Sequence, residues 1–144
     1  MAKREVKMTI ASDYSEARKA HREIMGAVDA SGFNESSTFA IKLALEEVLM
    51  NAIKHGNQCD PAKNVRIEAV ISPRQFELTV EDEGRGFDPA EVPDPRTEEN
   101  LEKIHGRGLL LMRSYMDEVE YTRGGRRVRM VKKNREEAPH PPPC

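Results

Sequence analysis

The sequence predicts an α+β fold, in which helices cover one face of a single mixed, mainly antiparallel sheet. Two observations lead to this class. Apolar residues alternate with polar residues in several short segments, as in strands with one buried face, whereas in two longer segments they recur every three or four residues, as in amphipathic helices. Helices and strands also come in groups along the chain, which is typical of α+β proteins rather than of repeated βαβ units.

Length and composition describe one globular domain. The 144 residues are enough for a single core, and a content of 38% hydrophobic and 33% charged residues separates this chain from disordered sequences. A net charge of -2 does not provide the basic surface that nucleic-acid binding needs. No apolar run reaches the length of a membrane span and no signal-type segment follows the basic N-terminus, so we expect a cytoplasmic location. Cys59 and Cys144 lack metal-site spacing, and their number excludes a disulfide scaffold.

The chain begins with a predicted strand and a predicted helix. Alternating apolar residues predict a strand over residues 5–10. Asp13 or Ser15 can cap the helix that follows over residues 17–30, because both side chains accept hydrogen bonds from free N–H groups. Gly32 comes directly after this helix and suits its end.

A long helix that ends at Gly56 organises the chain. Asn34 is placed to cap its start, and Gly56 is expected to end it in a left-handed conformation. One apolar stripe of this helix faces the core, and a neighbouring stripe carries Glu47, Asn51 and His55 at four-residue steps. An acid, an amide and an imidazole beside an apolar seam suit a metal–phosphate site, although a solvated helix face would show the same pattern.

Two hairpins complete the predicted sheet. Residues 65–71 and 76–81 alternate between apolar and polar side chains and are separated by a short turn with a proline. Residues 118–122 and 127–132 form the second predicted pair, across a turn that contains two glycines.

The segments between and after these hairpins are of a different kind. Residues 88–105 are polar and contain three prolines, and a connection of this length is expected to be either disordered or a lid over a site. An apolar helix is predicted over residues 109–116. We expect one domain over residues 1–133 and a disordered, charged and proline-rich tail over residues 134–144.

Residues 82–87 (Asp-Glu-Gly-Arg-Gly-Phe) end the third predicted strand. Asp82, when ionised, only accepts hydrogen bonds, so it suits the amino group of an adenine. Gly84 and Gly86 can take positive φ and allow the backbone to approach a flat ligand closely. A plain turn after an edge strand would look the same. The spacing excludes a calcium-binding EF-hand loop.

A second glycine element, Gly106-Arg-Gly108, precedes the apolar helix. Free N–H groups at a helix start attract phosphate, and Arg107 adds a charged donor, although a flexible hinge would have the same composition. Neither element has the third glycine of a Rossmann fingerprint. No Gly-x-x-x-x-Gly-Lys-Ser/Thr run is present, so a nucleotide would not bind through a P-loop.

The three motifs in order are far more specific than each alone. The chain reads Glu47-x-x-x-Asn51-Ala-x-x-His55-Gly56, then Asp82-x-Gly84-x-Gly86-Phe87, then a polar connection and Gly106-x-Gly108-Leu109. This order resembles the N, G1 and G2 boxes of the GHKL ATPase superfamily, known for the Bergerat ATP-binding fold, a two-layer α/β sandwich. The chain is similar to bacterial anti-sigma-factor serine/threonine kinases of the partner-switching (RsbW-like) type. It shares with them a small size, a leading strand and helix, and the residue pattern of the first motif.

The resemblance implies a role for each matching position. Asn51 would supply an oxygen to Mg²⁺, Glu47 would be the general base for the attacking hydroxyl, and Asp82 would receive the adenine amino group. Lys54 would reach a phosphate, unless it is a surface lysine, and His55 is read as structural. The residues that would frame the ATP or ADP are Gly84, Gly86, Gly106, Gly108 and Leu109.

Two positions depart from the family pattern. Members commonly carry threonine after the glycine of the last hairpin, close to the adenine, whereas Arg126 and Arg127 follow the glycines here. Glu46 beside Glu47 offers a second carboxylate. The spacing of four residues to Asn51 favours Glu47, since Glu46 lies about 100° round the helix.

The resemblance also implies partners. The protein would phosphorylate a STAS-type anti-anti-sigma protein and sequester a sigma factor, and it could form a homodimer. Arg18 and Arg22, one turn apart on the first helix, lie in the region that meets both partners in this family, although a solvated basic stripe would look alike. Two alternatives stay open: a nucleotide-dependent binding module without kinase activity, and a stand-alone histidine-kinase-type ATP-binding domain. The latter needs a phosphoaccepting histidine on a two-helix hairpin, and His21 lies on a single helix.

Overall fold

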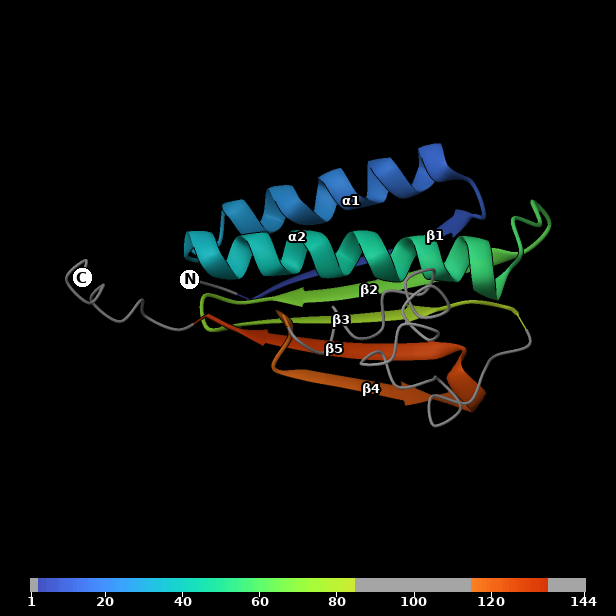
Figure 1. Cartoon of the computed structure of the whole chain (residues 1–144). Coiled ribbons are helices and arrows are strands. Elements are labelled where there is room, and N and C mark those ends of the chain that lie inside the picture. Colours follow the sequence, from blue (N-terminus) through green and yellow to red (C-terminus); the bar gives the residue numbers. More distant parts are fainter. Residues whose placement is uncertain (1–2, 85–114, 135–144) are drawn as a thin grey trace, which may run out of the picture.

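A computed structural model describes residues 3–84 and 115–134, which form two layers: a sheet and a pair of helices on one of its faces (Figure 1). The predicted α+β class is confirmed. The elements are β1 (Arg4–Ala11), α1 (Tyr14–Asp29), α2 (Glu35–Met50), the π-helix η1 (Asn51–Gly56), β2 (Asn64–Ile71), β3 (Gln75–Glu81), β4 (Glu118–Thr122), the short 3₁₀ turn η3 (Arg123–Gly125) and β5 (Arg127–Lys133).

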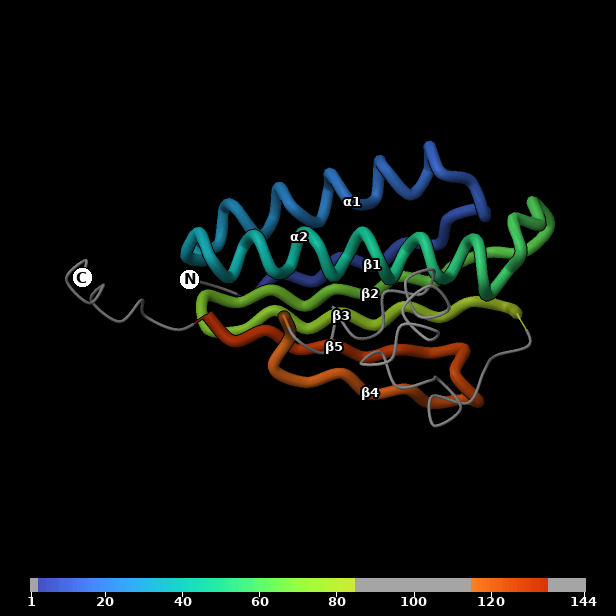
Figure 2. Tube along the Cα trace, viewed as in Figure 1, coloured from blue at the N-terminus to red at the C-terminus, as the bar shows by residue number. Residues whose placement is uncertain are grey.

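The five described strands follow the order β1-β2-β3-β5-β4, and their four pairings are all antiparallel. The hairpins β2–β3 and β4–β5 are the two that the sequence predicts. Pairing of β3 with β5 joins them, with Glu81 opposite Arg127. Figure 2 shows that β3 ends at the same end of the molecule as α2 and η1.

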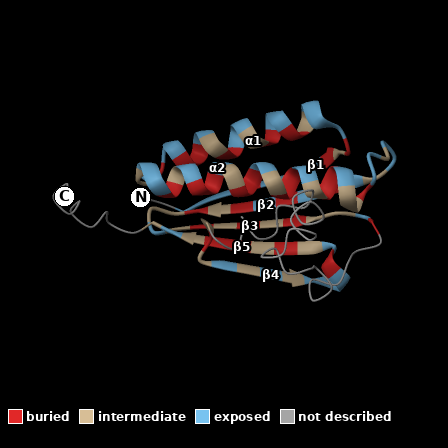
Figure 3. Cartoon of the chain, in the orientation of Figure 1, coloured by how far each residue is buried: buried red, intermediate tan, exposed pale blue. Residues whose placement is uncertain are grey.

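The core lies between the helices and the inner face of the sheet. Figure 3 shows buried residues on the sides of α1 and α2 that face the sheet, and on alternate positions of the strands. The large side chains that are wholly buried include Phe76, Leu78, Ile41, Leu45 and Met130. The outer face of the sheet carries charged residues, such as the ion pair between Arg129 and Glu77 (Nε to Oε1, 3.2 Å).

Side-chain caps fix the start of both helices. Asp13 caps α1, since its Oδ1 accepts a hydrogen bond from the Ser15 N–H (2.7 Å), and this bond lowers the pKa of the Asp13 carboxyl. Asn34 caps α2 as predicted, by accepting a hydrogen bond from the Ser37 N–H (2.7 Å). Gly32, with φ of 80°, lets the chain turn between the helices.

Asn134 ties the loops at one end of the sandwich together. Its Nδ2 donates to the carbonyl oxygens of Gly32 (3.1 Å) and Pro73 (2.9 Å), and its Oδ1 accepts from the Asn34 N–H (3.1 Å). The side chain thus connects the α1–α2 loop, the β2–β3 turn and the end of β5. Residues 135–144 of the predicted tail lie outside the described residues.

The end of the long helix differs from the prediction. Gly56 was expected to be left-handed, but the left-handed residues are Gln58 (φ 52°) and Cys59 (φ 57°). The reason is a change of hydrogen bonding: η1 is a π-helix, and the Asn57 N–H donates to the Ala52 carbonyl (2.8 Å), five residues back. The chain therefore reverses after Asn57 rather than at Gly56.

Gly56 and Gly84 are needed for close packing. A Cβ built on Gly56 would lie 2.4 Å from Cγ of Asp82, and a Cβ built on Gly84 would lie 1.9 Å from the carbonyl oxygen of Gly56. Gly84 can take a positive φ, but its φ in the structure lies outside that range. What this position requires is the absence of a side chain where the backbone of η1 meets the backbone after β3.

This contact predicts a large cost for Gly84→Ala. The added methyl forces two backbone segments apart, and overpacking of this kind costs about 1–3 kcal/mol. Urea unfolding should show a lower free energy of unfolding for this variant. Gly26→Ala is the matched control, because Gly26 lies in α1 with nothing near its missing Cβ, and alanine there is expected to raise stability by about 0.5–1 kcal/mol. If the free energy of unfolding of Gly84→Ala equalled that of the wild type, the close contact between Gly84 and Gly56 would be contradicted.

Candidate nucleotide-binding site

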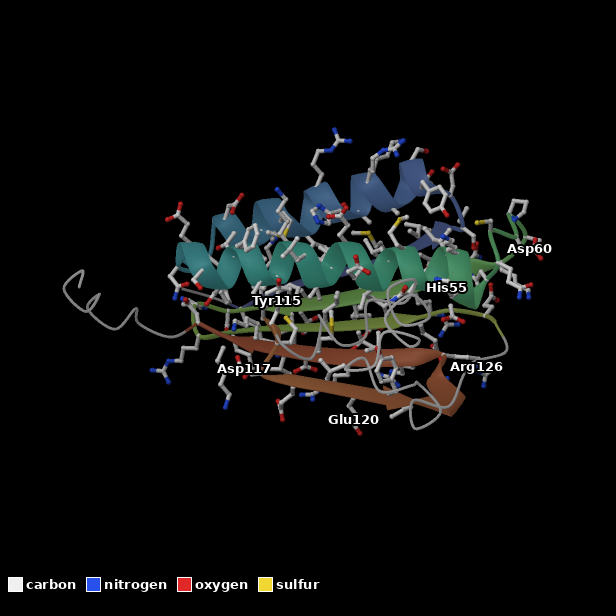
Figure 4. All side chains as sticks on the ribbon, in the orientation of Figure 1. His55, Asp60, Tyr115, Asp117, Glu120 and Arg126 are labelled. Atoms are coloured by element: carbon white, nitrogen blue, oxygen red, sulfur yellow. The ribbon has the colours of Figure 1, made fainter. Side chains whose placement is uncertain are left out.

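The stripe predicted on the long helix crosses the junction between α2 and η1. Glu47 lies in the last turn of α2, and Asn51 and His55 lie in η1; all three are partly buried. A π-helix bonds residue i to residue i+5, so the α-helical spacing on which the predicted stripe was based does not continue from Asn51 to His55. Figure 4 shows His55 at the same end of the molecule as Arg126. π-turns are frequently found at functional sites, which favours this end of the helix as one.

The two adjacent glutamates face different surroundings. Glu46 is exposed and lines a hollow between α1 and α2, together with Arg18 and His21. Glu47 is partly buried and is not part of that lining. This geometry separates the two carboxylates as the helical spacing predicts, and it leaves Glu47 on the side of Asn51. Lys54, the predicted phosphate contact, is exposed on η1.

Asp82 is held in place by backbone bonds on both sides. Its N–H donates to the Arg126 carbonyl (2.9 Å), and its Oδ1 accepts from the Gly84 N–H (2.8 Å). Its carboxylate lies against Gly56, with no room for a side chain between them. The structure therefore brings the end of the first predicted motif and the start of the second into direct contact.

Asn57 is wholly buried directly beyond η1, and the sequence did not predict it as a residue of the site. Its Oδ1 accepts a hydrogen bond from the Glu83 N–H (2.7 Å), and its Nδ2 donates to Ser12 Oγ (2.9 Å) and to the Asn64 carbonyl (3.0 Å). A Gly-Asn pair after a helix is typical of an exposed turn, so no sequence signal marks this asparagine as buried.

The arginines of the last hairpin lie on the outer side of the sheet. A polar hollow of 490 Å³ at the end of β3 is lined by Thr9, Asn64, Arg66, Glu81, Asp82, Glu83, Arg123 and Arg126. Glu81 pairs with Arg123 (2.9 Å) and more weakly with Arg66 (3.9 Å). Three arginines and three carboxylates offset one another there, so the hollow gives no net attraction for an anion.

Some predicted site residues cannot be placed. Gly86, Gly106, Gly108 and Leu109 lie outside the described residues, as does the connection over residues 88–105. Among the described residues, no group of three or more His, Cys, Asp or Glu side chains is placed to hold a metal ion.

Two further features concern the surroundings of His21 and the length of the described helices. His21 Nε2 lies 3.2 Å from the Lys42 carbonyl oxygen, so this ring nitrogen is engaged between α1 and α2. Within the described ranges, no helix is both long and apolar enough to cross a membrane.

The chain matches one domain family and is similar in sequence to several known proteins. Residues 10–132 match the family described as "Histidine kinase-like ATPase domain". The anti-sigma F factor of Clostridium perfringens is 35% identical over 99 residues, which cover 66% of this chain and 70% of that protein. The anti-sigma F factor of Halalkalibacterium halodurans is 41% identical over 83 residues, 56% of each chain.

A solved structure shows the same fold. The crystal structure of the RsbU and RsbW domains of a Mycobacterium tuberculosis protein aligns with a TM-score of 0.59 and 16% identity, over 92% of this chain and 32% of that one. In most of the curated relatives the matched segment spans little more than half of the protein, for example 59% of a second Clostridium perfringens factor. The family match covers most of the chain, and the protein therefore belongs to the family of histidine kinase-like ATPase domains.

Proposed function

We propose that the protein is an ATP-binding anti-sigma factor with protein serine/threonine kinase activity. The observation that carries this proposal is the contact of Gly56 with Asp82 and Gly84. It brings a carboxylate suited to an adenine amino group next to the helix that bears Glu47 and Asn51. Similarity to anti-sigma F factors supports the same reading.

In this proposal, the nucleotide lies between the end of the long helix and the segment after β3. Asp82 accepts a hydrogen bond from the adenine amino group, and the Gly84 N–H on its Oδ1 keeps the carboxylate oriented. The side chain of Asn51 would help to hold Mg²⁺, and Lys54 would reach a phosphate. Gly86, Gly106, Gly108 and Leu109 frame the rest of the nucleotide. The bound Mg²⁺ would neutralise charge on the phosphates, which is the main requirement of phosphoryl transfer.

The reaction would be in-line transfer of the γ-phosphoryl group. A serine or threonine hydroxyl oxygen of the partner attacks the γ-phosphorus, and the bond from that phosphorus to the β–γ bridging oxygen breaks. ADP leaves with the bond electrons, and the hydroxyl proton passes to the carboxylate of Glu47. A carboxylate within hydrogen-bond reach is suited to this role.

The hollow between α1 and α2 supports the proposed partners, a sigma factor and an anti-anti-sigma protein. It has a volume of 630 Å³, an apolar floor that includes Ala17 and Leu49, and basic walls that include Arg18 and Arg22. Tyr14 and Met50, which also line it, are 38% and 39% exposed. Exposed apolar groups beside arginines are typical of protein interfaces.

Two alternatives are weighed against this proposal. A binding module without kinase activity would use the same nucleotide contacts, and only a transfer assay separates the two. A histidine-kinase-type domain is disfavoured, because His21 is partly buried and its Nε2 already contacts a carbonyl oxygen. Acid treatment of the labelled product distinguishes the chemistries, since phosphoserine survives acid and phosphohistidine does not.

Asn51→Ala tests the nucleotide site. The wild type should bind Mg²⁺-ATP in calorimetry, and the variant should bind at least about 10-fold more weakly, a loss of about 1.4 kcal/mol. Lys42→Ala, an exposed residue earlier on α2, is the control and should bind as the wild type does. No heat and no thermal stabilisation of the wild type at millimolar Mg²⁺-ATP would refute the proposal.

Glu47→Gln tests the base. The variant should keep its affinity for ATP and lose transfer to a STAS-type anti-anti-sigma protein by about 100-fold or more, because the proton acceptor is gone. Glu35→Gln makes the same chemical change at the exposed start of α2, away from Asn51 and outside the hollow, and should transfer at a rate close to the wild type. A wild-type rate of phosphoryl transfer in Glu47→Gln would show that Glu47 is not the general base.

Arg18→Glu tests the partner surface. A reversed charge inside the hollow should weaken binding to the sigma factor by about 10-fold or more, as loss of an interface arginine commonly does. Lys19→Glu changes the net charge equally on the neighbouring exposed position, which does not line the hollow. Biolayer interferometry compares the two variants, and equal losses would indicate long-range charge rather than a contact.

A further inference from the structure

We infer that Asn57 is a positioning residue of the nucleotide site: its buried side chain holds the Asp82–Gly84 segment against the end of the helix that carries Asn51. The inference rests on the proposed nucleotide binding and adds a residue that none of the recognised motifs contains. Asn57 would act through its neighbours and would not touch the nucleotide itself.

The amide group of Asn57 is almost fully used. It is 0% exposed and makes three hydrogen bonds, one through Oδ1 and two through Nδ2. Ser12 Oγ, which accepts one of them, donates in turn to the Lys63 carbonyl (2.7 Å). One side chain thus connects four segments: the end of η1, the β1–α1 turn, the start of β2 and the residues after β3.

The hydrogen bond from the Glu83 N–H to Asn57 Oδ1 lies in the middle of the segment from Asp82 to Gly84. Three successive N–H groups there are satisfied: that of Asp82 by the Arg126 carbonyl, that of Glu83 by Asn57 Oδ1, and that of Gly84 by Asp82 Oδ1. The first bond ties the segment to β5 and the third is internal to it. The bond from Asn57 ties it to the helix side, and so it holds the segment against η1 at the close approach that Gly56 and Gly84 allow.

A structural role alone would not predict an effect on nucleotide affinity, and the chain offers a control for this. Asn134 makes the same number of side-chain hydrogen bonds at the opposite end of the sandwich, where it joins the α1–α2 loop to the β2–β3 turn (Figure 1). Removal of either amide should lower the melting temperature. Only Asn57 lies beside the site.

The experiment compares Asn57→Ala, Asn134→Ala and the wild-type chain. Calorimetry with Mg²⁺-ATP gives the Kd, and thermal unfolding without nucleotide gives the Tm. We expect a lower Tm for both variants. The Kd should rise about 10-fold for Asn57→Ala, the equivalent of a lost hydrogen bond at the site, and should change less than about 2-fold for Asn134→Ala.

Ser12→Ala keeps the test decisive if Asn57→Ala does not fold. It removes one partner of Nδ2 and leaves the amide in place, so the Kd should rise by about 3-fold. Hydrogen exchange without ATP adds a second readout: the Glu83 amide should exchange faster in Asn57→Ala and Ser12→Ala, and at the wild-type rate in Asn134→Ala.

The outcomes are distinguishable. A wild-type Kd in Asn57→Ala, or in Ser12→Ala if that is the variant that folds, would overturn this inference alone. An equal rise of the Kd in Asn134→Ala would also overturn it, because the effect would then follow general stability. A wild-type chain that does not bind Mg²⁺-ATP would overturn the proposed function, and the inference with it.

Discussion

The backbone of η1 and the backbone that follows β3 are in contact at Gly56 and Gly84, and the candidate site depends on that contact. A side chain on either residue would overlap the other segment or the Asp82 carboxylate. Interiors are close-packed, so such an overlap is relieved only by moving the elements apart. The separation of the Asp82 carboxylate from the helix that bears Asn51 is therefore set by backbone atoms, which vary less in position than long side chains do.

Two buried or partly buried asparagines hold the layers together at opposite ends. Asn134 joins the helix connection to the sheet at one end, and Asn57 joins the end of η1, the β1–α1 turn, the start of β2 and the segment after β3 at the other. Asparagine suits this task because its amide offers both donors and acceptors in one plane. The core between these ends is apolar and gives little directional preference, so the polar ties are what fix the loops relative to one another.

Local patterns predicted most of the fold. Strand alternation gave both hairpins, and the cap at Asn34 was recognised because N-capping involves residues close in sequence. The π-turn was not predicted, since the residues that favour α- and π-turns are alike. The burial of Asn57 and the true reason for Gly84 depend on contacts between segments distant in the sequence, and no local pattern encodes them.

Helix α2 contributes side chains both to the hollow beside α1 and to the candidate nucleotide site. This arrangement would bring the proposed partner close to the proposed nucleotide. Glu46 faces the hollow beside α1, whereas Glu47 lies about 100° round the helix on the side of Asn51. A partner seated in the hollow is then one helix width from the nucleotide. The hydroxyl that receives a phosphoryl group must reach the γ-phosphate in line and close to the base. In the proposed complex the last turn of α2 would meet both demands, because Glu46, on the hollow, and Glu47, the proposed base, are consecutive residues there.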